Sequence, residues 1–141
     1  MPFGTPPDEK KKIIANFKHA LEEYDIKVPG MGSNLFYYNV FKDGAFTSTD
    51  PKIRALAVRK SMDALDIGAE LGIDTYIIWS GRDGIEVEAS KDPIKALEHF
   101  RDCLNFLADY VKIEGIRIDS LWKRNPMSLE ATYISQPQVP C

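Results

Sequence analysis

Histidine is the side chain of this sequence that is best suited to acid–base chemistry. The two histidines are His19 and His99, and a histidine beside a carboxylate or a thiol is the usual general base. His19 falls on the polar side of one predicted helix and His99 on the flank of another, so we expect both rings to be solvated. Neither can be paired with a nucleophile, and the sequence predicts no catalytic residue in this chain.

Carboxylates crowd the region between residues 83 and 92. Carboxylate oxygens can hold hard cations such as Mg²⁺ or Ca²⁺, but the spacing of Asp83, Glu86, Glu88 and Asp92 matches no known cation-binding loop. The neighbouring glycines at 81 and 84 lack the lysine and helix start of a phosphate loop. We therefore predict a solvated acidic loop, with no metal ligand and no cofactor for this chain.

Two aromatic side chains are placed where a substrate could bind. Phe36 and Trp79 each fall at the carboxyl end of a predicted strand, which is where ligand pockets open in parallel α/β sheets. An aromatic ring suits a sugar, because the C–H face of the sugar packs on the ring while its hydroxyls bond to polar groups. Phe36 and Trp79 are thus the candidate substrate-pocket residues, and core packing is the alternative.

Helices and strands alternate along the elements that must position these residues. Apolar spacing predicts helices over residues 8–25, 49–72 and 92–111, and apolar runs predict strands within 27–36, at 75–79 and at 115–118. Such alternation is typical of an α/β protein built from parallel βαβ units. From residue 119 onward the pattern is lost, and we expect an unstructured tail.

The bulk composition fits one soluble domain. The 141 residues are 44% hydrophobic and 28% charged, with a net charge of -3. Basic and acidic residues are interleaved, so we expect no nucleic-acid binding. No apolar run reaches the roughly 20 residues of a membrane helix, so we expect no membrane contact and a cytoplasmic protein. Cys103 and Cys141 are expected to be reduced thiols.

Four motifs together resemble a known family. They are Asn34-Leu35-Phe36, VFKDGAFTS at residues 40–48, AELG at 69–72 and WSGRDG at 79–84. In order and spacing they resemble the second-to-fourth-strand region of the shorter, actinobacterial-type xylose isomerases. The resemblance runs from about residue 1 to residue 118, and we take 1–118 as one domain and 119–141 as a tail outside the family pattern.

The resemblance implies a fold and an activity. Family members are eight-stranded barrels, usually tetramers, which use two divalent metals (Mg, Mn or Co) to interconvert D-xylose and D-xylulose by a hydride shift. It implies here a partial TIM-type (β/α) barrel, with about three parallel strands alternating with three helices. Phe36 and Trp79 match aromatic residues that wall the sugar pocket. Gly32 replaces a common threonine, and residues 37–39 replace a histidine-containing turn.

The family's catalytic residues are expected to lie outside this chain. The resemblance places the catalytic histidine upstream of residue 1, and a metal-ligating glutamate and a lysine after Ile118, where the sequence reads DSLWKRNP. Codons permitted for residues 119 onward can spell the family motif F-A-L-E-x-K-P-N-E-P-R-G-D-I in the neighbouring frame. We hypothesise that the tail is a frameshifted reading of the gene. If the gene does not spell that motif in the neighbouring frame, the hypothesis is wrong.

We therefore expect a xylose isomerase fragment that is inactive alone. Exposed edges predict association with itself or with a full-length isomerase subunit. One alternative is non-catalytic binding of a pentose or hexose, and another is an oligomerisation fragment that docks on full-length isomerase. A similar metal-dependent barrel, such as an apurinic-site endonuclease, is disfavoured by the balanced charge and by the lack of histidine ligands.

Overall fold

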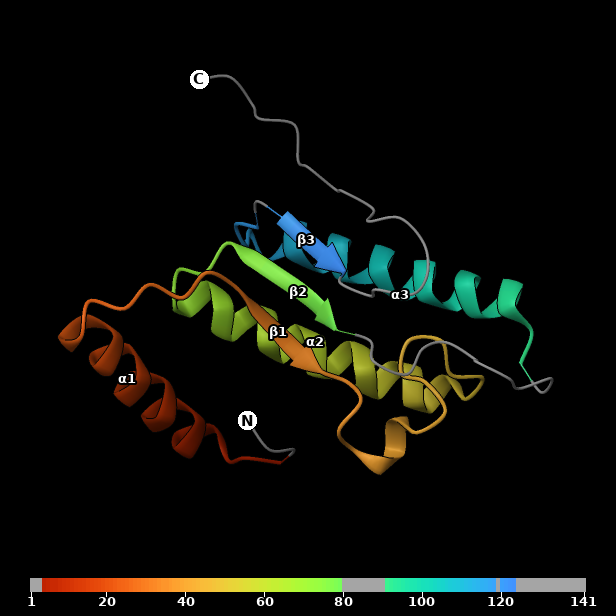
Figure 1. Ribbon diagram of the computed structural model, residues 1–141, viewed down its shortest axis with the longest axis horizontal. Helices are drawn as coiled ribbons and strands as arrows, with labels where there is room; N and C mark the ends of the chain where they lie inside the picture. The colour runs from red at the N-terminus through yellow and green to blue at the C-terminus, as the bar shows by residue number, and fades with distance from the viewer. Residues whose placement is uncertain (1–3, 80–90, 119, 124–141) are drawn as a thin grey trace, which may run out of the picture.

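The computed structural model describes residues 4–79, 91–118 and 120–123, with the backbone alone described for Trp79 and for 120–123. Helices and strands alternate along the chain, as predicted (Figure 1). The elements are α1 (Pro7–Glu23), β1 (Met31–Asn34), the short 3-10 helix η1 (Asn39–Phe41), α2 (Pro51–Glu70), β2 (Thr75–Trp79), α3 (Pro93–Ile113) and β3 (Ser120–Lys123).

The two longest helices begin in the same way. The carboxylate of Asp50 accepts a hydrogen bond from the backbone N–H of Lys52 at 2.8 Å, and that of Asp92 accepts from the N–H of Ile94 at 2.9 Å. In both cases the aspartate is followed by a proline in the first turn, where the missing N–H costs nothing. These caps explain why the starts of α2 and α3 could be read from the sequence.

The three strands form one parallel sheet in the order β1-β2-β3. Asn34 at the end of β1 pairs with Trp79 at the end of β2, and Thr75 at the start of β2 pairs with Ser120. All three strands therefore direct their carboxyl ends to the same edge of the sheet. The parallel α/β arrangement predicted from the sequence is confirmed.

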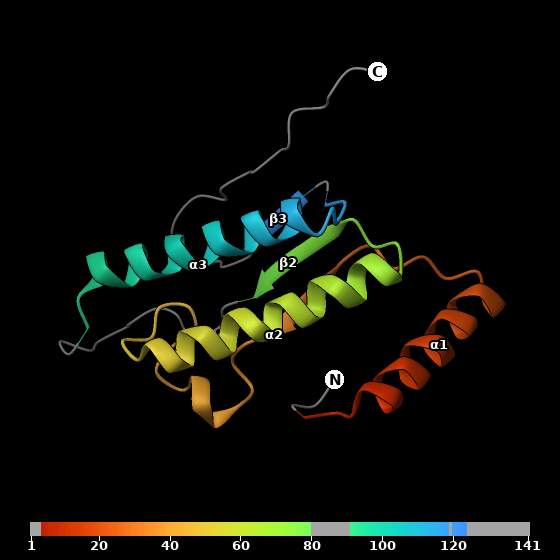
Figure 2. The same cartoon turned by 180° about the vertical axis from the view of Figure 1, so that it is seen from behind.

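The helices are distributed unevenly around this sheet. Both α2 and α3 lie on one face of it, as the two opposite views show (Figures 1 and 2). In both views α1 lies apart, beyond the β1 edge. Among the described residues, no helix covers the opposite face of the sheet, so this part of the chain forms one layer of helices on one face of a sheet.

The hydrophobic core lies between the sheet and helices α2 and α3. It includes Phe41 and Phe46, which are both 0% exposed, and Leu107 of α3. The rings of Phe46 and Phe100 meet edge to face, with centroids 5.9 Å apart. The segment at residues 40–48 therefore folds over the core as a loop that buries two aromatic side chains.

Three hydroxyl groups form a polar cluster within this layer. The Tyr76 hydroxyl donates to Ser33 Oγ at 2.8 Å, and Ser33 Oγ lies 3.1 Å from Ser61 Oγ. All three residues are buried, and burial raises the pKa of the Tyr76 hydroxyl. Because each of these buried hydroxyls has a partner, the cluster links β1, β2 and α2 without leaving one of the three unpaired.

The third strand begins later in the chain than the predicted position at residues 115–118. Gly115 has a φ of +63°, and the N–H of Ile116 donates to the Val111 carbonyl at 3.0 Å, so these residues terminate α3. Ile116 and Ile118 then pack against the core, and the strand begins only at Ser120. The third strand therefore lies in the segment that the sequence assigned to the tail, while residues 124–141 lie outside the described residues.

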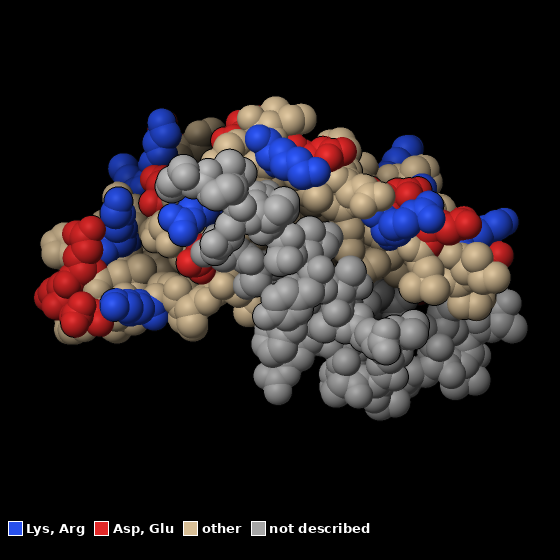
Figure 3. Space-filling model, turned by 90° about the horizontal axis from the view of Figure 1, so that it is seen from above, with Lys and Arg blue, Asp and Glu red and all other residues tan. Residues whose placement is uncertain are grey.

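The surface carries charges of both signs. Lys and Arg side chains lie next to Asp and Glu side chains over the described part of one face, without a single extended basic patch (Figure 3). None of the helices in the described residues is long and apolar enough to cross a membrane. The expectations on nucleic acids and membranes remain predictions.

Gly32 lies where β1 and β2 approach each other closely. A Cβ atom at this position would lie 2.4 Å from the carbonyl oxygen of Ile77, its register partner. This oxygen belongs to the backbone of the neighbouring strand, so it cannot move without displacing β2. Glycine at this position is thus required by strand packing, and the threonine of the resembled family would not fit this pairing.

We expect Gly32→Ala to lower the free energy of unfolding by about 1–3 kcal/mol, the usual cost of overpacking. Gly30→Ala is the matched control, because its Cβ would meet the flexible end of the Ile77 side chain at 3.3 Å. Urea unfolding followed by circular dichroism measures both variants. Equal losses of unfolding free energy in the two variants would show that the close approach at Gly32 does not by itself require glycine.

Candidate functional site

The carboxyl end of the sheet carries the predicted pocket residues. Asn34 Oδ1 accepts hydrogen bonds from the backbone N–H groups of Phe36 at 3.3 Å and Tyr37 at 3.1 Å. An asparagine that bonds the backbone two and three residues ahead forms an Asx-type turn. This turn ends β1 and directs the chain that carries Phe36 across the edge of the sheet.

Phe36 is half-buried and lies beside Tyr37. The two ring centroids are 6.4 Å apart and their planes are inclined by 62°, an edge-to-face arrangement. Trp79 ends β2 and pairs in register with Asn34, but its side chain is outside the described residues. The structure thus brings both positions to the same edge of the sheet, and a shared aromatic wall stays a prediction.

The predicted acidic loop is described only at its end. Asp83, Glu86 and Glu88 lie outside the described residues, as does the glycine pair at 81 and 84. Asp92 is described, and its carboxylate caps α3 through Ile94. Asp92 Oδ1 therefore stabilises the first turn of α3.

The two histidines differ in environment. The side chain of His19 is 79% exposed and lies 3.9 Å from a carboxylate oxygen of Glu23, as expected for a solvated helix surface. The predicted solvated ring of His99 is wrong. The His99 side chain is half-buried, and its Nδ1 atom is buried without a hydrogen-bond partner among the described residues. His99 borders a groove between α2 and α3, together with Met62 and Phe106, since its side of α3 turns toward α2.

A metal ion would need a cluster of donor side chains. Within 4–79, 91–118 and 120–123, no three His, Cys, Asp or Glu side chains come together closely enough to hold an ion. The described side chains by themselves thus do not supply a site for the two divalent metals that the resemblance implies.

One groove of the described structure was not predicted from the sequence. It has a volume of about 910 Å³ and lies between α1, β1 and α2. Its polar lining includes Lys10, Ser33, Asn34, Arg59, Lys60 and Asp63. The spacing of Arg59 and Asp63 by four residues predicts an ion pair on one helix face, but only the tertiary structure brings Lys10 of α1 to the same place.

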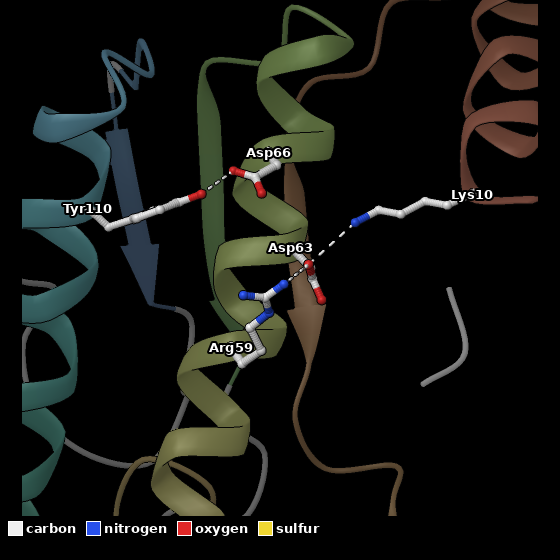
Figure 4. A network of polar contacts seen from close by, with 5 residues as sticks. All are labelled: Lys10, Arg59, Asp63, Asp66 and Tyr110. Atoms are coloured by element: carbon white, nitrogen blue, oxygen red, sulfur yellow. Dashed lines mark hydrogen bonds and ion pairs between the residues drawn. The ribbon is translucent and has the colours of Figure 1, made fainter. Parts of the chain in front are cut away.

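Asp63 joins the two walls of this groove (Figure 4). Its Oδ1 lies 3.4 Å from Lys10 Nζ of α1 and 3.8 Å from an Arg59 nitrogen. Lys60 Nζ lies over the ring of Tyr38, 4.1 Å from its centroid, and burial lowers the pKa of Lys60. Three cationic side chains and one carboxylate therefore line the groove, which gives it a positive balance.

A second polar contact joins α2 to α3. The Tyr110 hydroxyl donates to Asp66 Oδ1 at 2.6 Å (Figure 4). This hydrogen bond, followed by burial and by the negative charge of Asp66, raises the pKa of Tyr110 to about 12. The contact stabilises the protonated phenol, because only that form can donate to the carboxylate.

Comparison with known proteins identifies the family. The family model described as "Xylose isomerase-like TIM barrel" matches residues 1–119. The xylose isomerase of Thermus thermophilus is 50% identical over 115 residues, which cover 82% of this chain. The chain belongs to the xylose isomerase-like TIM barrel family. The xylose isomerase of Thermus caldophilus is 49% identical over the same share of the chain.

This xylose isomerase-like chain corresponds to only part of the length of its relatives. It spans 30% of the length of both Thermus enzymes. A solved D-tagatose 3-epimerase-like protein aligns with a TM-score of 0.63 and 16% identity, over 89% of this chain and 41% of that one. This last likeness concerns the fold, and it agrees with the predicted partial TIM-type barrel.

We expect the contact between Tyr110 and Asp66 to make stability depend on alkaline pH. The folded-state pKa is about 12 and that of an unfolded tyrosine is about 10. The stabilisation is therefore complete below about pH 10 and is lost as the pH rises from about 10 to about 12. Tyr110→Phe should flatten this loss in urea unfolding, whereas Tyr24→Phe, at an exposed residue after α1, should leave it unchanged. A loss of the same size in Tyr110→Phe would contradict the assignment.

Proposed function

We propose that this chain forms a sector of an aldose–ketose isomerase barrel whose reaction is the conversion of D-xylose to D-xylulose by a metal-assisted hydride shift. The 50% identity to a protein named xylose isomerase carries this proposal. It is supported by the parallel sheet, whose strands end together at the edge where barrel enzymes hold their substrates.

The role that we propose for this sector is to supply part of the sugar pocket. Phe36 follows the Asx-type turn at Asn34, and Trp79 ends the neighbouring strand, so both follow carboxyl ends of strands, where the proposed pocket would open. An aromatic ring there would pack against the C–H face of a sugar and exclude water from it. The described residues form no donor cluster for the divalent metals, and we infer that the 141-residue chain alone does not isomerise sugar.

We expect no conversion of D-xylose to D-xylulose by the purified 141-residue chain above the rate without protein. The assay is run with Mg²⁺, Mn²⁺ and Co²⁺ in turn, because the hydride shift needs a Lewis acid to polarise the sugar carbonyl. Metal-binding calorimetry on the same sample is the second readout. Turnover, or tight binding of any of the three metals, would contradict the proposal of inactivity and reveal a metal site outside the described residues.

A second candidate function is non-catalytic and has two forms. The chain either binds a sugar without converting it, or is an oligomerisation fragment that associates with itself or docks on a full-length isomerase subunit. The half-burial of Phe36 just after the carboxyl end of β1 favours the first form. The outer side of β1, which pairs with no strand of the described residues, favours the second. Association by either route would complete the barrel wall around the sugar.

If the sugar-binding form holds, calorimetry with D-xylose should give saturable heat, and Phe36→Ala should weaken binding by about two- to tenfold, since a stacked aromatic contributes about 0.5–1.5 kcal/mol. Phe106→Ala is the matched control, because Phe106 is a 54% exposed aromatic on α3, away from the sheet edge. Absence of saturable heat, or equal weakening by both substitutions, would exclude sugar binding at this edge.

A further inference from the structure

The groove between α2 and α3, which His99 borders, is not used by the function proposed above. It has a volume of about 430 Å³, which lies within the range of small-molecule sites in proteins. Its walls are formed by side chains from residues 54–62 of α2 and 99–106 of α3, two helices that lie side by side on one face of the sheet (Figure 2). The groove is therefore a feature of the helix layer, and both of its walls belong to the described residues.

The two ends of this groove carry different side chains. Helices α2 and α3 run in the same direction (Figure 2), and the hydrogen bond that joins them connects residues 44 positions apart. Since both helices rise equally per residue, the same offset places Phe106 opposite Met62 and His99 close to the level of Arg54. Arg54 and His99 thus lie at one end of the groove, and Met62 and Phe106 lie at the other.

Arg54 is held firmly at the polar end. Its Nη1 atom donates to the carbonyl oxygen of Ser48 at 2.7 Å and to that of Thr49 at 3.1 Å. Both bonds use Nη1, so Nε and Nη2 of the same planar group make no hydrogen bond to the described residues. A guanidinium fixed in this way is preorganised for a carboxylate, which accepts two parallel hydrogen bonds from such a fork.

His99 offers a second donor at the same end. Its Nδ1 atom is buried without a hydrogen-bond partner among the described residues. The neutral ring is therefore more stable with its proton on Nε2, because a buried N–H without an acceptor is costly. Nε2 is the ring nitrogen that remains for the groove, which the His99 side chain lines. An N–H donor near the Arg54 fork again suits an acceptor oxygen.

The charges of the lining complement a ligand with a single negative charge. Arg59 and Asp102 already face opposite charges, since an Arg59 nitrogen lies 3.8 Å from Asp63 and an Asp102 oxygen lies 3.1 Å from Arg101. Arg54 makes no ion pair within the described part of the chain. One positive charge is thus left for a ligand, and a single carboxylate matches it.

The rest of the groove is apolar. Val58, Met62 and Phe106 line the part beyond Arg54, and the Phe106 side chain is 54% exposed. The rise of α2 from Arg54 to Met62 is about 12 Å. An apolar body of about this length would cover the exposed ring of Phe106 and remove apolar surface from water.

We propose that the groove between α2 and α3 binds a small amphipathic carboxylate, whose head group lies at Arg54 and His99 and whose apolar body extends toward Phe106. The fork of Arg54 selects the carboxylate, and the apolar part of the groove selects against short acids. This site is separate from the sugar chemistry proposed above, and its test uses neither sugar nor metal.

Calorimetry on the whole 141-residue chain tests this proposal with four probes. They are octanoate, octylammonium, 1-octanol and acetate, which separate the contribution of the charged head from that of the apolar body. Octanoate is expected to give saturable heat and to bind at least about tenfold more tightly than each of the other three. Absence of saturable heat with octanoate, or equal affinity for octanoate and octylammonium, would overturn the proposal.

Two pairs of variants locate the bound octanoate. Arg54→Gln should weaken binding by about tenfold, because it removes a hydrogen bond to a charged group. Lys95→Gln is its matched control, since Lys95 is exposed on α3 and does not line the groove. Phe106→Ala should weaken binding by about threefold through lost apolar contact. Its control is Leu97→Ala, at a 55% exposed side chain of α3 outside the groove.

Equal weakening by a variant and its control would overturn the proposal, because octanoate would then bind elsewhere. Circular dichroism checks the fold of each variant, since Arg54 also bonds the loop before α2. If Arg54→Gln does not fold, the comparison of Phe106→Ala with Leu97→Ala and the four probes on the unaltered chain still decide.

Discussion

The burial of one sheet face against α2 is the contact on which the rest of the structure depends. Small residues on α2, among them Ala57, Ser61 and Ala64, are buried beneath the strands and let the helix axis approach the sheet closely. The Tyr76 hydroxyl, bonded to Ser33, fixes β1 and β2 relative to this helix. A polar cluster that is fully paired specifies one arrangement, because any shift of a strand would leave a buried hydroxyl without a partner.

This anchoring has a direct consequence for the candidate site. Because β1 and β2 are held parallel and in register, Asn34 and Trp79 end at the same level. The Asx-type turn at Asn34 then sets the path of the chain to Phe36. Rigid strands beneath a short turn hold side chains more accurately than a free loop does, which suits a pocket wall in the proposed isomerase.

The same arrangement leaves the described sheet incomplete. Among the strands that the structure describes, β2 alone pairs with β1, and α1 lies across a groove instead of on the strand. The cations of this groove converge on Asp63, so the carboxylate lowers the repulsion between Lys10 and Arg59 while the groove keeps a positive balance.

The sequence by itself determined the alternating elements, the helix starts at Asp50 and Asp92 and the strand at residues 75–79. It also determined the family. Helix capping, apolar periodicity and motif order are local properties, so the sequence alone records them. It misplaced the third strand, because the glycine turn that ends α3 uses residues 115–116, and apolar side chains that pack on a core look like a strand in sequence. Only the tertiary structure decided the burial of His99, the close approach at Gly32 and the cationic groove. Each of these depends on backbone atoms or side chains from elements far apart in the chain, and no local pattern records such distances.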